Sequence, residues 1–236
     1  MKILAIAHDP GIDLGTYEDI VRAAGHELEY ASFQQAIAPS QPLHEYGAVF
    51  ILGGRAQVDQ EDKHPWLVDE KRFIRAVQDK GMPTLGICFG GQLLAELNGA
   101  KVGPLSELEI GWFDLRVPEE IGVDPVFEAN GNVKTLIWHQ YAFETPPGAV
   151  TLARTDVASQ AFRVGDHVWG VQFHPEISPS GLAEWFDFER GHAEIGEGLT
   201  RLMDEAPEHL EAVADSGGRL CEAFLRFAES RPQRAW

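Results

Sequence analysis

The sequence contains little cysteine. Only two cysteines occur in 236 residues, Cys88 and Cys221, and they lie far apart in different sequence contexts. Domains that depend on disulfides carry a denser set of cysteines. A disulfide framework is therefore not expected, and Cys88 is predicted to be a free thiol.

Long apolar runs are also absent. No stretch of about 18 apolar residues exists, which is the length that a membrane-spanning helix requires. The N-terminal segment MKILAIAHDP turns polar too soon for a signal peptide. We therefore expect a cytoplasmic protein.

Positive charge is the third scarce feature. The chain has 19 Lys and Arg against 37 Asp and Glu, which gives a formal net charge of -18. Nucleic-acid backbones and anionic membrane surfaces would be repelled over a broad area, so neither is an expected partner. The acidic residues are dispersed along the sequence, as is typical of a solvated surface.

The first half of the chain alternates strand and helix patterns. Apolar runs predict buried strands, and amphipathic segments bounded by proline and glycine predict helices between them. The expected strands are residues 2–8, 28–32, 47–54 and 83–87, and the expected helices are residues 15–27 and 65–81. This order predicts parallel strands joined by helical crossovers.

After Gly99 the pattern changes. Short alternating segments separated by Pro, Gly and Asn predict antiparallel strands, at residues 109–117, 132–139, 149–155, 160–165 and 167–174. We predict an α/β fold with a flavodoxin-like, parallel or mixed central sheet, helices on both faces, and a small antiparallel section.

From residue 180 onward the pattern is helical again. We expect one domain over residues 1–236, with a helical appendage from about 190 to 236 that is interrupted at Gly217-Gly218. The amphipathic part of this appendage either packs on the domain or forms a partner or homodimer surface.

The segment Gly86-Ile87-Cys88-Phe89-Gly90 joins a predicted strand to a predicted helix. Small residues on both sides of the cysteine permit the sharp turn that holds a nucleophile at its apex. The N–H groups at the start of the helix would favour the thiolate. The alternative is a buried core thiol with glycines for packing, and this segment does not separate the two.

A second candidate lies at His174-Pro175-Glu176. The proline biases His174 toward an extended backbone, in which residues two apart project to the same side. Glu176 is therefore expected beside the His174 ring, where a carboxylate fixes the imidazole tautomer. A surface turn would explain the same three residues, but with Cys88 they supply the parts of a Cys-His-Glu mechanism.

Two backbone N–H groups are candidates for an oxyanion hole. Gly54 ends the apolar segment FILGG, and Phe89 directly follows the cysteine. Acyl transfer requires two such donors, although a turn with positive φ would also explain the glycines. Gln92, one helical turn after Cys88, can reach a substrate bound there or face solvent.

Three segments, GICFGGQLLAELNGAKV, GVQFHPE and ILGG, together resemble the class I glutamine amidotransferases. The resemblance runs from about residue 46 to about residue 186. Within the family, the chain is most similar to stand-alone members, which resemble the glutaminase domain of GMP synthetase but have no synthetase attached. It implies Cys88 as nucleophile, His174 as base and acid, and Glu176 as the orienting carboxylate. It also implies oxyanion donation by Gly54 and Phe89 and a glutamyl contact from Gln92.

Two departures from the family pattern fall at the implied glutamyl pocket. Arg55 stands where many relatives have Pro or Ser, and His139-Gln140-Tyr141 stands where they often read His-Gly-Asp. Arg55, Trp138, Gln140 and Tyr141 are therefore candidate substrate-binding residues, although an aromatic residue at a strand end also fits the core. The changes favour a substrate larger than glutamine.

Three functions are compatible with these residues. The first is hydrolysis of a γ-glutamyl amide, either glutamine or a γ-glutamyl conjugate of an amine or peptide, through a cysteinyl γ-glutamyl thioester. The second is a glutaminase subunit that supplies ammonia to a separate synthetase. The third, a non-enzymatic binding protein, is disfavoured by the complete triad. No metal-binding spacing and no phosphate loop occur, so no metal or cofactor is expected.

Overall fold

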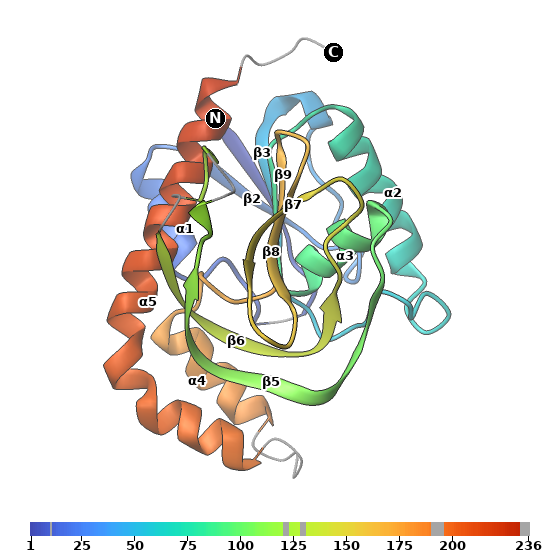
Figure 1. Cartoon of the computed structure of the whole chain (residues 1–236). Coiled ribbons are helices and arrows are strands. Elements are labelled where there is room, and N and C mark those ends of the chain that lie inside the picture. The colour runs from blue at the N-terminus through green and yellow to red at the C-terminus, as the bar shows by residue number, and fades with distance from the viewer. Residues whose placement is uncertain (10, 120–122, 128–130, 190–195, 232–236) are drawn as a thin grey trace.

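A seven-stranded sheet forms the centre of the computed structural model, which describes residues 1–9, 11–119, 123–127, 131–189 and 196–231 (Figure 1). The strand pairs from β2 to β9 are parallel, and β8 runs antiparallel to both β9 and β7. In spatial order the strands are β2 (Glu27–Ala31), β1 (Lys2–Ile6), β3 (Tyr46–Ile51), β4 (Thr84–Ile87), β9 (Val168–Val171), β8 (Ser159–Val164) and β7 (Val150–Arg154). This is the predicted mixed α/β architecture.

Helices cover both faces of the sheet (Figure 1). The helices are α1 (Thr16–Ala23), α2 (Trp66–Asp79), α3 (Phe89–Leu97), α4 (Pro179–Glu189) and α5 (Gly196–Ser230), with a short 3-10 helix, η1, at Leu43–Glu45. Alternation along β1 explains the two layers, because Ile3 packs with residues of α1 and α5 while Leu4 packs with residues of α2 and α3. Because the strands from β2 to β9 are parallel, their carboxyl ends meet at one edge of the sheet. The candidate site, with Cys88 after β4 and His174 after β9, lies at this edge.

Strand β9 differs from the sequence-based expectation. The segment 167–174 was expected to pair as an antiparallel strand, and it does so with β8, but it also pairs in parallel with β4. All four residues of β9 are buried. A strand buried on both faces shows no alternation from which its partners could be inferred. The parallel pairing places the segment after β9 beside the end of β4.

The predicted break at Gly217-Gly218 is wrong. Helix α5 runs continuously for 35 residues, through this glycine pair and through Pro207. A Cβ at Gly217 would overlap the carbonyl oxygen of Pro175, so glycine is needed here for close approach of the helix. Phe224 of α5 belongs to the main hydrophobic core. Parts of the expected appendage, residues 190–195 and 232–236, lie outside the described residues.

An antiparallel ribbon crosses one side of the sheet (Figure 1). It consists of β5 (Val102–Arg116) and β6 (Asn132–Phe143), which pair only with each other among the described strands. Leu136 of β6 packs against Leu182 of α4 and Leu202 of α5. Leu136 also forms an isolated bridge with His174, so the ribbon reaches the site.

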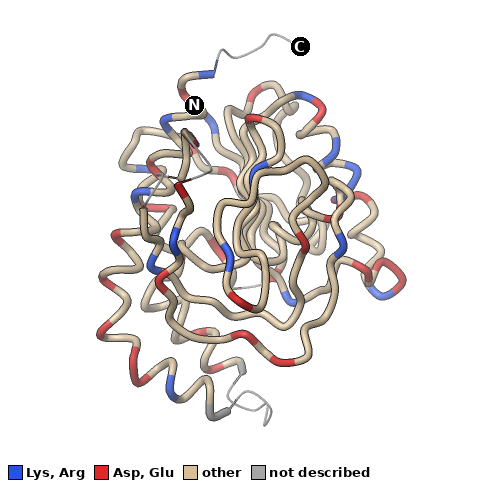
Figure 2. The backbone as a smooth tube through the Cα atoms, viewed as in Figure 1, with Lys and Arg blue, Asp and Glu red and all other residues tan. Residues whose placement is uncertain are grey.

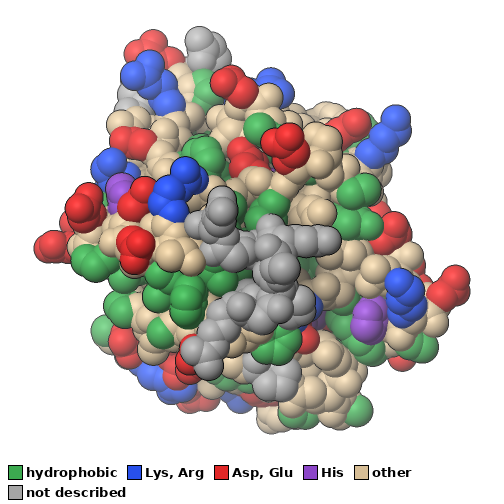
Figure 3. All heavy atoms as spheres, turned by 90° about the horizontal axis from the view of Figure 1, so that it is seen from below, with side chains coloured by type: hydrophobic (Ala, Val, Ile, Leu, Met, Phe, Trp, Pro, Cys, Tyr) green, Lys and Arg blue, Asp and Glu red, His purple; other side chains and the backbone are tan. Residues whose placement is uncertain are grey.

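Charge is dispersed over the molecule. Asp and Glu are spread over the helices and loops and are interspersed with Lys and Arg (Figure 2). On the face seen in Figure 3, apolar, acidic and basic side chains are mixed around the residues drawn in grey. Of the helices in the described ranges, none has the length and apolar character needed to cross a membrane.

Candidate active site

Cys88 lies at a strained turn between β4 and α3. Its backbone has φ 51° and ψ -108°, a positive-φ conformation that is rare for residues with a side chain. The flanking glycines are sterically required, because a Cβ at Gly90 would overlap the carbonyl oxygen of Ile51 and one at Gly86 would crowd that of Gly90. Such strain is typical of functional sites and is not needed to bury a core thiol.

Cys221 provides the contrast. It is fully buried on α5, within the main hydrophobic core. Burial raises the pKa of the Cys221 thiol above its ordinary value. This cysteine is therefore an unreactive packing residue.

His174 and Glu176 form a buried pair beside Cys88. His174 Nδ1 and Glu176 Oε1 are 2.9 Å apart, so the predicted contact is present, although Pro175 and Glu176 lie in a turn and not in the expected extended segment. The backbone N–H of His174 donates to the carbonyl oxygen of Leu136 at 2.8 Å. The ring is also fixed by an edge-on contact with Trp185, with ring centroids 4.7 Å apart.

The charge of His174 follows from its neighbours. Burial lowers its pKa, but the negative charges of Glu176 and Cys88 and hydrogen bonds to both side chains raise it to about 10. The cationic ring is therefore the dominant form at neutral pH. The imidazole lies between the sulfur and the carboxylate, with its Nδ1 fixed by Glu176. This is the arrangement of a nucleophile, a base and an orienting group.

The backbone of Gly53 and Gly54 passes close to the side chains of His174 and Cys88. A Cβ at Gly53 would lie 3.3 Å from Cε1 of His174 and 3.9 Å from Cβ of Cys88. In the part of the chain that the structure describes, the N–H groups of Gly54 and Phe89 donate no hydrogen bond to a protein acceptor. Two free N–H groups beside a sulfur are suited to an oxyanion.

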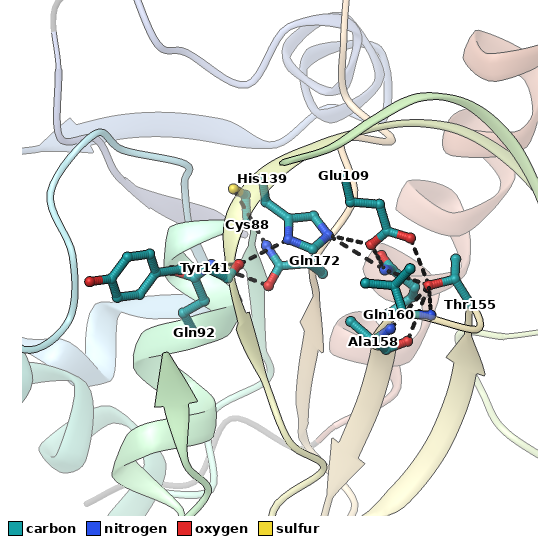
Figure 4. Close-up of polar contacts among 10 residues, drawn as sticks. Cys88, Gln92, Glu109, His139, Tyr141, Thr155, Ala158, Gln160 and Gln172 are labelled. Carbon is teal, nitrogen blue, oxygen red and sulfur yellow. Dashed lines mark hydrogen bonds and ion pairs between the residues drawn. The ribbon is translucent and has the colours of Figure 1, made fainter. Parts of the chain in front are cut away.

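Behind the sulfur lies a network of side-chain amides (Figure 4). Gln172 Nε2 donates toward Cys88 Sγ at 3.7 Å, and its Oε1 accepts from Gln92 Nε2 at 3.2 Å. Gln92 Nε2 also donates to the carbonyl oxygen of Tyr141 at 2.8 Å. The Gln92 interaction fixes the Gln172 amide with its NH₂ group toward the sulfur, so Gln172 favours the thiolate.

The same network ends in a second buried His-Glu pair (Figure 4). His139 Nδ1 lies 2.9 Å from the Tyr141 carbonyl oxygen, and His139 Nε2 lies 2.9 Å from Glu109 Oε2. Both ring nitrogens of His139 are thus engaged by polar partners, which fixes the ring between the two strands of the ribbon and the amide network. Burial raises the pKa of Glu109, but hydrogen bonds from His139 and Thr155 and the His139 charge lower it overall. Gln160 Nε2 also donates to this carboxylate, at 2.8 Å.

A small cavity opens onto Cys88. Its lining comprises Ile12, Gly53, Gly54, Arg55, Cys88, Trp138, His174 and Trp185. Arg55 and Trp138, two of the candidate substrate-binding residues, therefore lie at the site. Trp138 and Trp185 form one apolar wall, with ring centroids 6.0 Å apart.

The other candidate substrate-binding residues lie elsewhere. Gln140 is exposed and does not line this cavity, and Tyr141 contributes its backbone carbonyl to the amide network. Gln92 is buried, with its amide nitrogen used by two internal acceptors. Substrate contacts from these three residues stay predictions.

Several site residues were not singled out from the sequence. Trp185 reads as an ordinary apolar position of a helix, and Gln172 reads as one position of a strand end. Neither carries a local signal, because their proximity to Cys88 depends on the parallel pairing of β4 and β9. Among the described residues, no group of three or more His, Cys, Asp and Glu side chains is arranged to hold a metal ion.

A cysteine and a His-Glu pair at the edge of an α/β sheet are the side chains that acyl transfer through a thiol requires. The family model of the class-I glutamine amidotransferases matches residues 15–187. The chain belongs to this family.

Similar proteins agree with this assignment. GMP synthase (glutamine-hydrolysing) of Thermomicrobium roseum is 37% identical over 137 residues, which are 57% of this chain and 24% of that protein. The GMP synthase of Heliobacterium modesticaldum is 31% identical over 219 residues, covering 88% of this chain and 40% of that protein. The chain thus spans well under half the length of these relatives.

A solved structure matches nearly the whole chain. A glutamine amidotransferase from Thermotoga maritima superposes with a TM-score of 0.86 at 28% identity, covering 98% of this chain and 99% of that one. A glutamine amidotransferase from Methylobacillus flagellatus has the same fold, with a TM-score of 0.81 at 20% identity and coverage of 96% and 94%.

Proposed function

We propose that the protein hydrolyses a γ-glutamyl amide through a thioester on Cys88. The substrate is glutamine or a γ-glutamyl conjugate of an amine or peptide. The observation that carries this proposal is the placement of His174 between Cys88 and Glu176, beneath the Gly53–Gly54 backbone.

The first half of the reaction forms the thioester. The Cys88 thiolate attacks the γ-carbonyl carbon, and the N–H groups of Gly54 and Phe89 bind the resulting oxyanion. The imidazolium of His174 gives its proton to the nitrogen of the leaving group as the C–N bond breaks. Ammonia or an amine departs, and a γ-glutamyl thioester and a neutral imidazole remain.

The second half releases the acid. Neutral His174 takes a proton from water, and the hydroxide attacks the thioester carbon. The C–S bond breaks, glutamate leaves, and the thiolate and imidazolium are restored. Glu176 keeps the Nδ1 proton of His174 in place, so that Nε2 carries out both transfers.

The cavity lining supports a substrate larger than glutamine. Trp138 and Trp185 offer apolar surface beyond the sulfur, and the guanidinium carbon of Arg55, which lines the same cavity, lies 3.7 Å from the ring centroid of Phe188. The NH₂ leaving group of glutamine would not use such surface, whereas the apolar part of an amine or peptide conjugate would.

The second candidate function is ammonia supply to a separate synthetase. It is favoured by the match to one part of longer proteins that are named glutamine-hydrolysing GMP synthases. In this function glutamine is the substrate, and the acceptor of the ammonia is carried by another chain.

The test offers the purified protein glutamine, several γ-glutamyl amines and several γ-glutamyl peptides, and measures release of ammonia or amine. We expect turnover of conjugates without a partner, loss of turnover in Cys88→Ala, and retention in Cys221→Ala. Turnover of glutamine only when a synthetase is added would favour the second function. Full turnover in Cys88→Ala would contradict the mechanism.

A further inference from the structure

A third buried His-Glu pair, His8 with Glu70, lies directly behind the Gly53–Gly54 backbone. His8 follows β1 and Glu70 lies on α2, and both side chains are fully buried. His8 Nε2 is 2.7 Å from Glu70 Oε1, and His8 Nδ1 is 2.9 Å from the carbonyl oxygen of Gly53. The mechanism above makes no use of either residue.

The two contacts define the protons on His8. A carbonyl oxygen only accepts hydrogen bonds, so Nδ1 carries a proton and donates it to Gly53. The Glu70 carboxylate likewise accepts from Nε2, which makes the ring an imidazolium. Burial lowers the pKa of His8, but the Glu70 charge and the hydrogen bonds to Glu70 and Gly53 raise it above its ordinary value.

The contact with Gly53 determines where the next N–H points. In a trans peptide unit, the C=O of one residue and the N–H of the following residue lie on opposite sides. No cis peptide bond occurs among the described residues. Because His8 holds the Gly53 carbonyl on its own side, the N–H of Gly54 points the other way, toward the cavity that Gly54 shares with Cys88.

His8 also contacts the residue that carries the other N–H group. Its ring meets Phe89 edge-on, with centroids 4.8 Å apart and planes at 89°. A Cβ at Gly54 would lie 3.0 Å from Cβ of His8 and 3.1 Å from Cδ1 of Phe89. The His8 side chain therefore contacts both residues that carry these N–H groups, and little space is left at Gly54 for its backbone to shift.

The pair has little value as a stabilising device. A buried ion pair is often no better than well-packed apolar residues, because both charges lose their hydration. Glu70 Oε2 is buried without a hydrogen-bond partner among the described residues, which adds to the cost. Costs of this kind are expected where a residue serves the site and not the stability of the fold.

We propose that His8, held in place by Glu70, is a positioning residue that directs the N–H of Gly54 into the oxyanion hole. The inference rests on the proposed function, since it assigns His8 to the same acyl-transfer step. The positive ring also polarises the Gly53–Gly54 peptide and so strengthens the hydrogen bond that Gly54 gives to the oxyanion.

Two substitutions separate the two contacts of the ring. In His8→Asn the side-chain amide nitrogen takes the place of Nδ1 and keeps the bond to Gly53. In His8→Gln it takes the place of Nε2 and keeps only the approach to Glu70. We expect kcat to fall about 100-fold in His8→Gln, with KM changed less than about threefold, because one oxyanion donor is lost. We expect His8→Asn to retain kcat within about tenfold.

A merely structural role would give a different pattern. Loss of packing would lower the melting temperature of both variants alike and would leave kcat of the folded fraction similar in both. His26 provides the control. It pairs with Glu229 at 3.1 Å, and it does not line the cavity beside Cys88. His26→Gln is expected to leave kcat unchanged.

Crystal structures of the two His8 variants give a readout that does not depend on turnover. We expect the Gly53–Gly54 peptide to keep its orientation in His8→Asn and to rotate or become mixed in His8→Gln. Equal kcat values in the two variants together with an unrotated peptide in His8→Gln would overturn the inference. If the wild type turned over no γ-glutamyl substrate, the proposed function would fail, and the peptide orientation would still decide the role of His8.

Discussion

Thr16 holds the backbone of Glu176 across 160 residues of sequence. The backbone N–H and the hydroxyl of Thr16 donate to the Glu176 carbonyl oxygen at 2.8 and 3.1 Å. Thr16 is the first residue of α1, so the start of this helix anchors the backbone of the residue that carries the carboxylate of the His-Glu pair. The geometry of the site therefore depends on a helix that contributes no side chain to the chemistry.

Gly15→Ala tests this anchor. Gly15 has φ 51°, and a Cβ there would overlap the Glu176 carbonyl oxygen. We expect a loss of about 3 kcal/mol in the free energy of unfolding, from backbone strain and from displacement of Glu176. The matched control is Gly25→Ala, at φ 77° with no atom within 4 Å of the added Cβ, which is expected to cost about 1 kcal/mol. Equal losses in urea unfolding of the two variants would contradict the anchor.

Glu176→Gln tests the charge on His174. The raised pKa of about 10, against an ordinary value of 6.5, makes protonated His174 a stabilising group. Its contribution is complete below pH 6.5 and is lost as the pH rises through about 10. The free energy of unfolding of the wild type is therefore expected to exceed that of Glu176→Gln by about 3 kcal/mol at pH 6. The difference becomes smaller as the pH approaches 10.

Urea unfolding of both proteins at pH 6, 8 and 10 measures this difference, and NMR of labelled histidine follows the His174 ring directly. We expect the ring of the wild type to titrate near pH 10 and that of Glu176→Gln at a lower pH. A difference in stability that grew with pH would contradict the assigned charge.

The sequence predicted the fold where the signals are local. Periodicity and terminal Pro and Gly residues place α2 within one or two residues of its observed bounds. The parallel partner of β9 and the continuity of α5 were missed, because each depends on a contact between distant segments. Gly217, which suggests a break, is instead the position at which α5 approaches Pro175.

The candidate site shows the same division between residues with a local sequence signal and residues that meet only through contacts between distant segments. Cys88, His174 and Glu176 are recognisable from short motifs, since the turn and the i, i+2 spacing are properties of a few neighbouring residues. His8 and Glu70 lie 62 positions apart and meet only when β1 and α2 pack around Phe89. Gln172 likewise faces the sulfur only after β9 has paired with β4.

Gln172→Leu tests the hydrogen bond to Cys88, the proposed nucleophile. Leucine has a similar size but no donor, so the thiolate of Cys88 loses one stabilising partner. We expect the rate of Cys88 alkylation by iodoacetamide at pH 7 to fall about tenfold. The exposed Gln35 supplies the control, and Gln35→Leu is expected to leave the rate unchanged. An unchanged rate in Gln172→Leu would show that the amide packs beside the sulfur without acting on it.

Arg55→Ala tests the proposed preference for a leaving group larger than ammonia. Arg55 lines the cavity beside Trp138 and Trp185, and its guanidinium stacks on Phe188. If Arg55 contacts the leaving group, its removal lowers kcat/KM for γ-glutamyl conjugates about tenfold. The kcat/KM for glutamine stays nearly unchanged, because its leaving group, ammonia, is too small to extend from Cys88 to Arg55. Competition assays between glutamine and one conjugate measure the ratio directly. An equal fall for both substrates would place Arg55 on the glutamyl group that they share, and would remove the leaving group as the reason for this arginine.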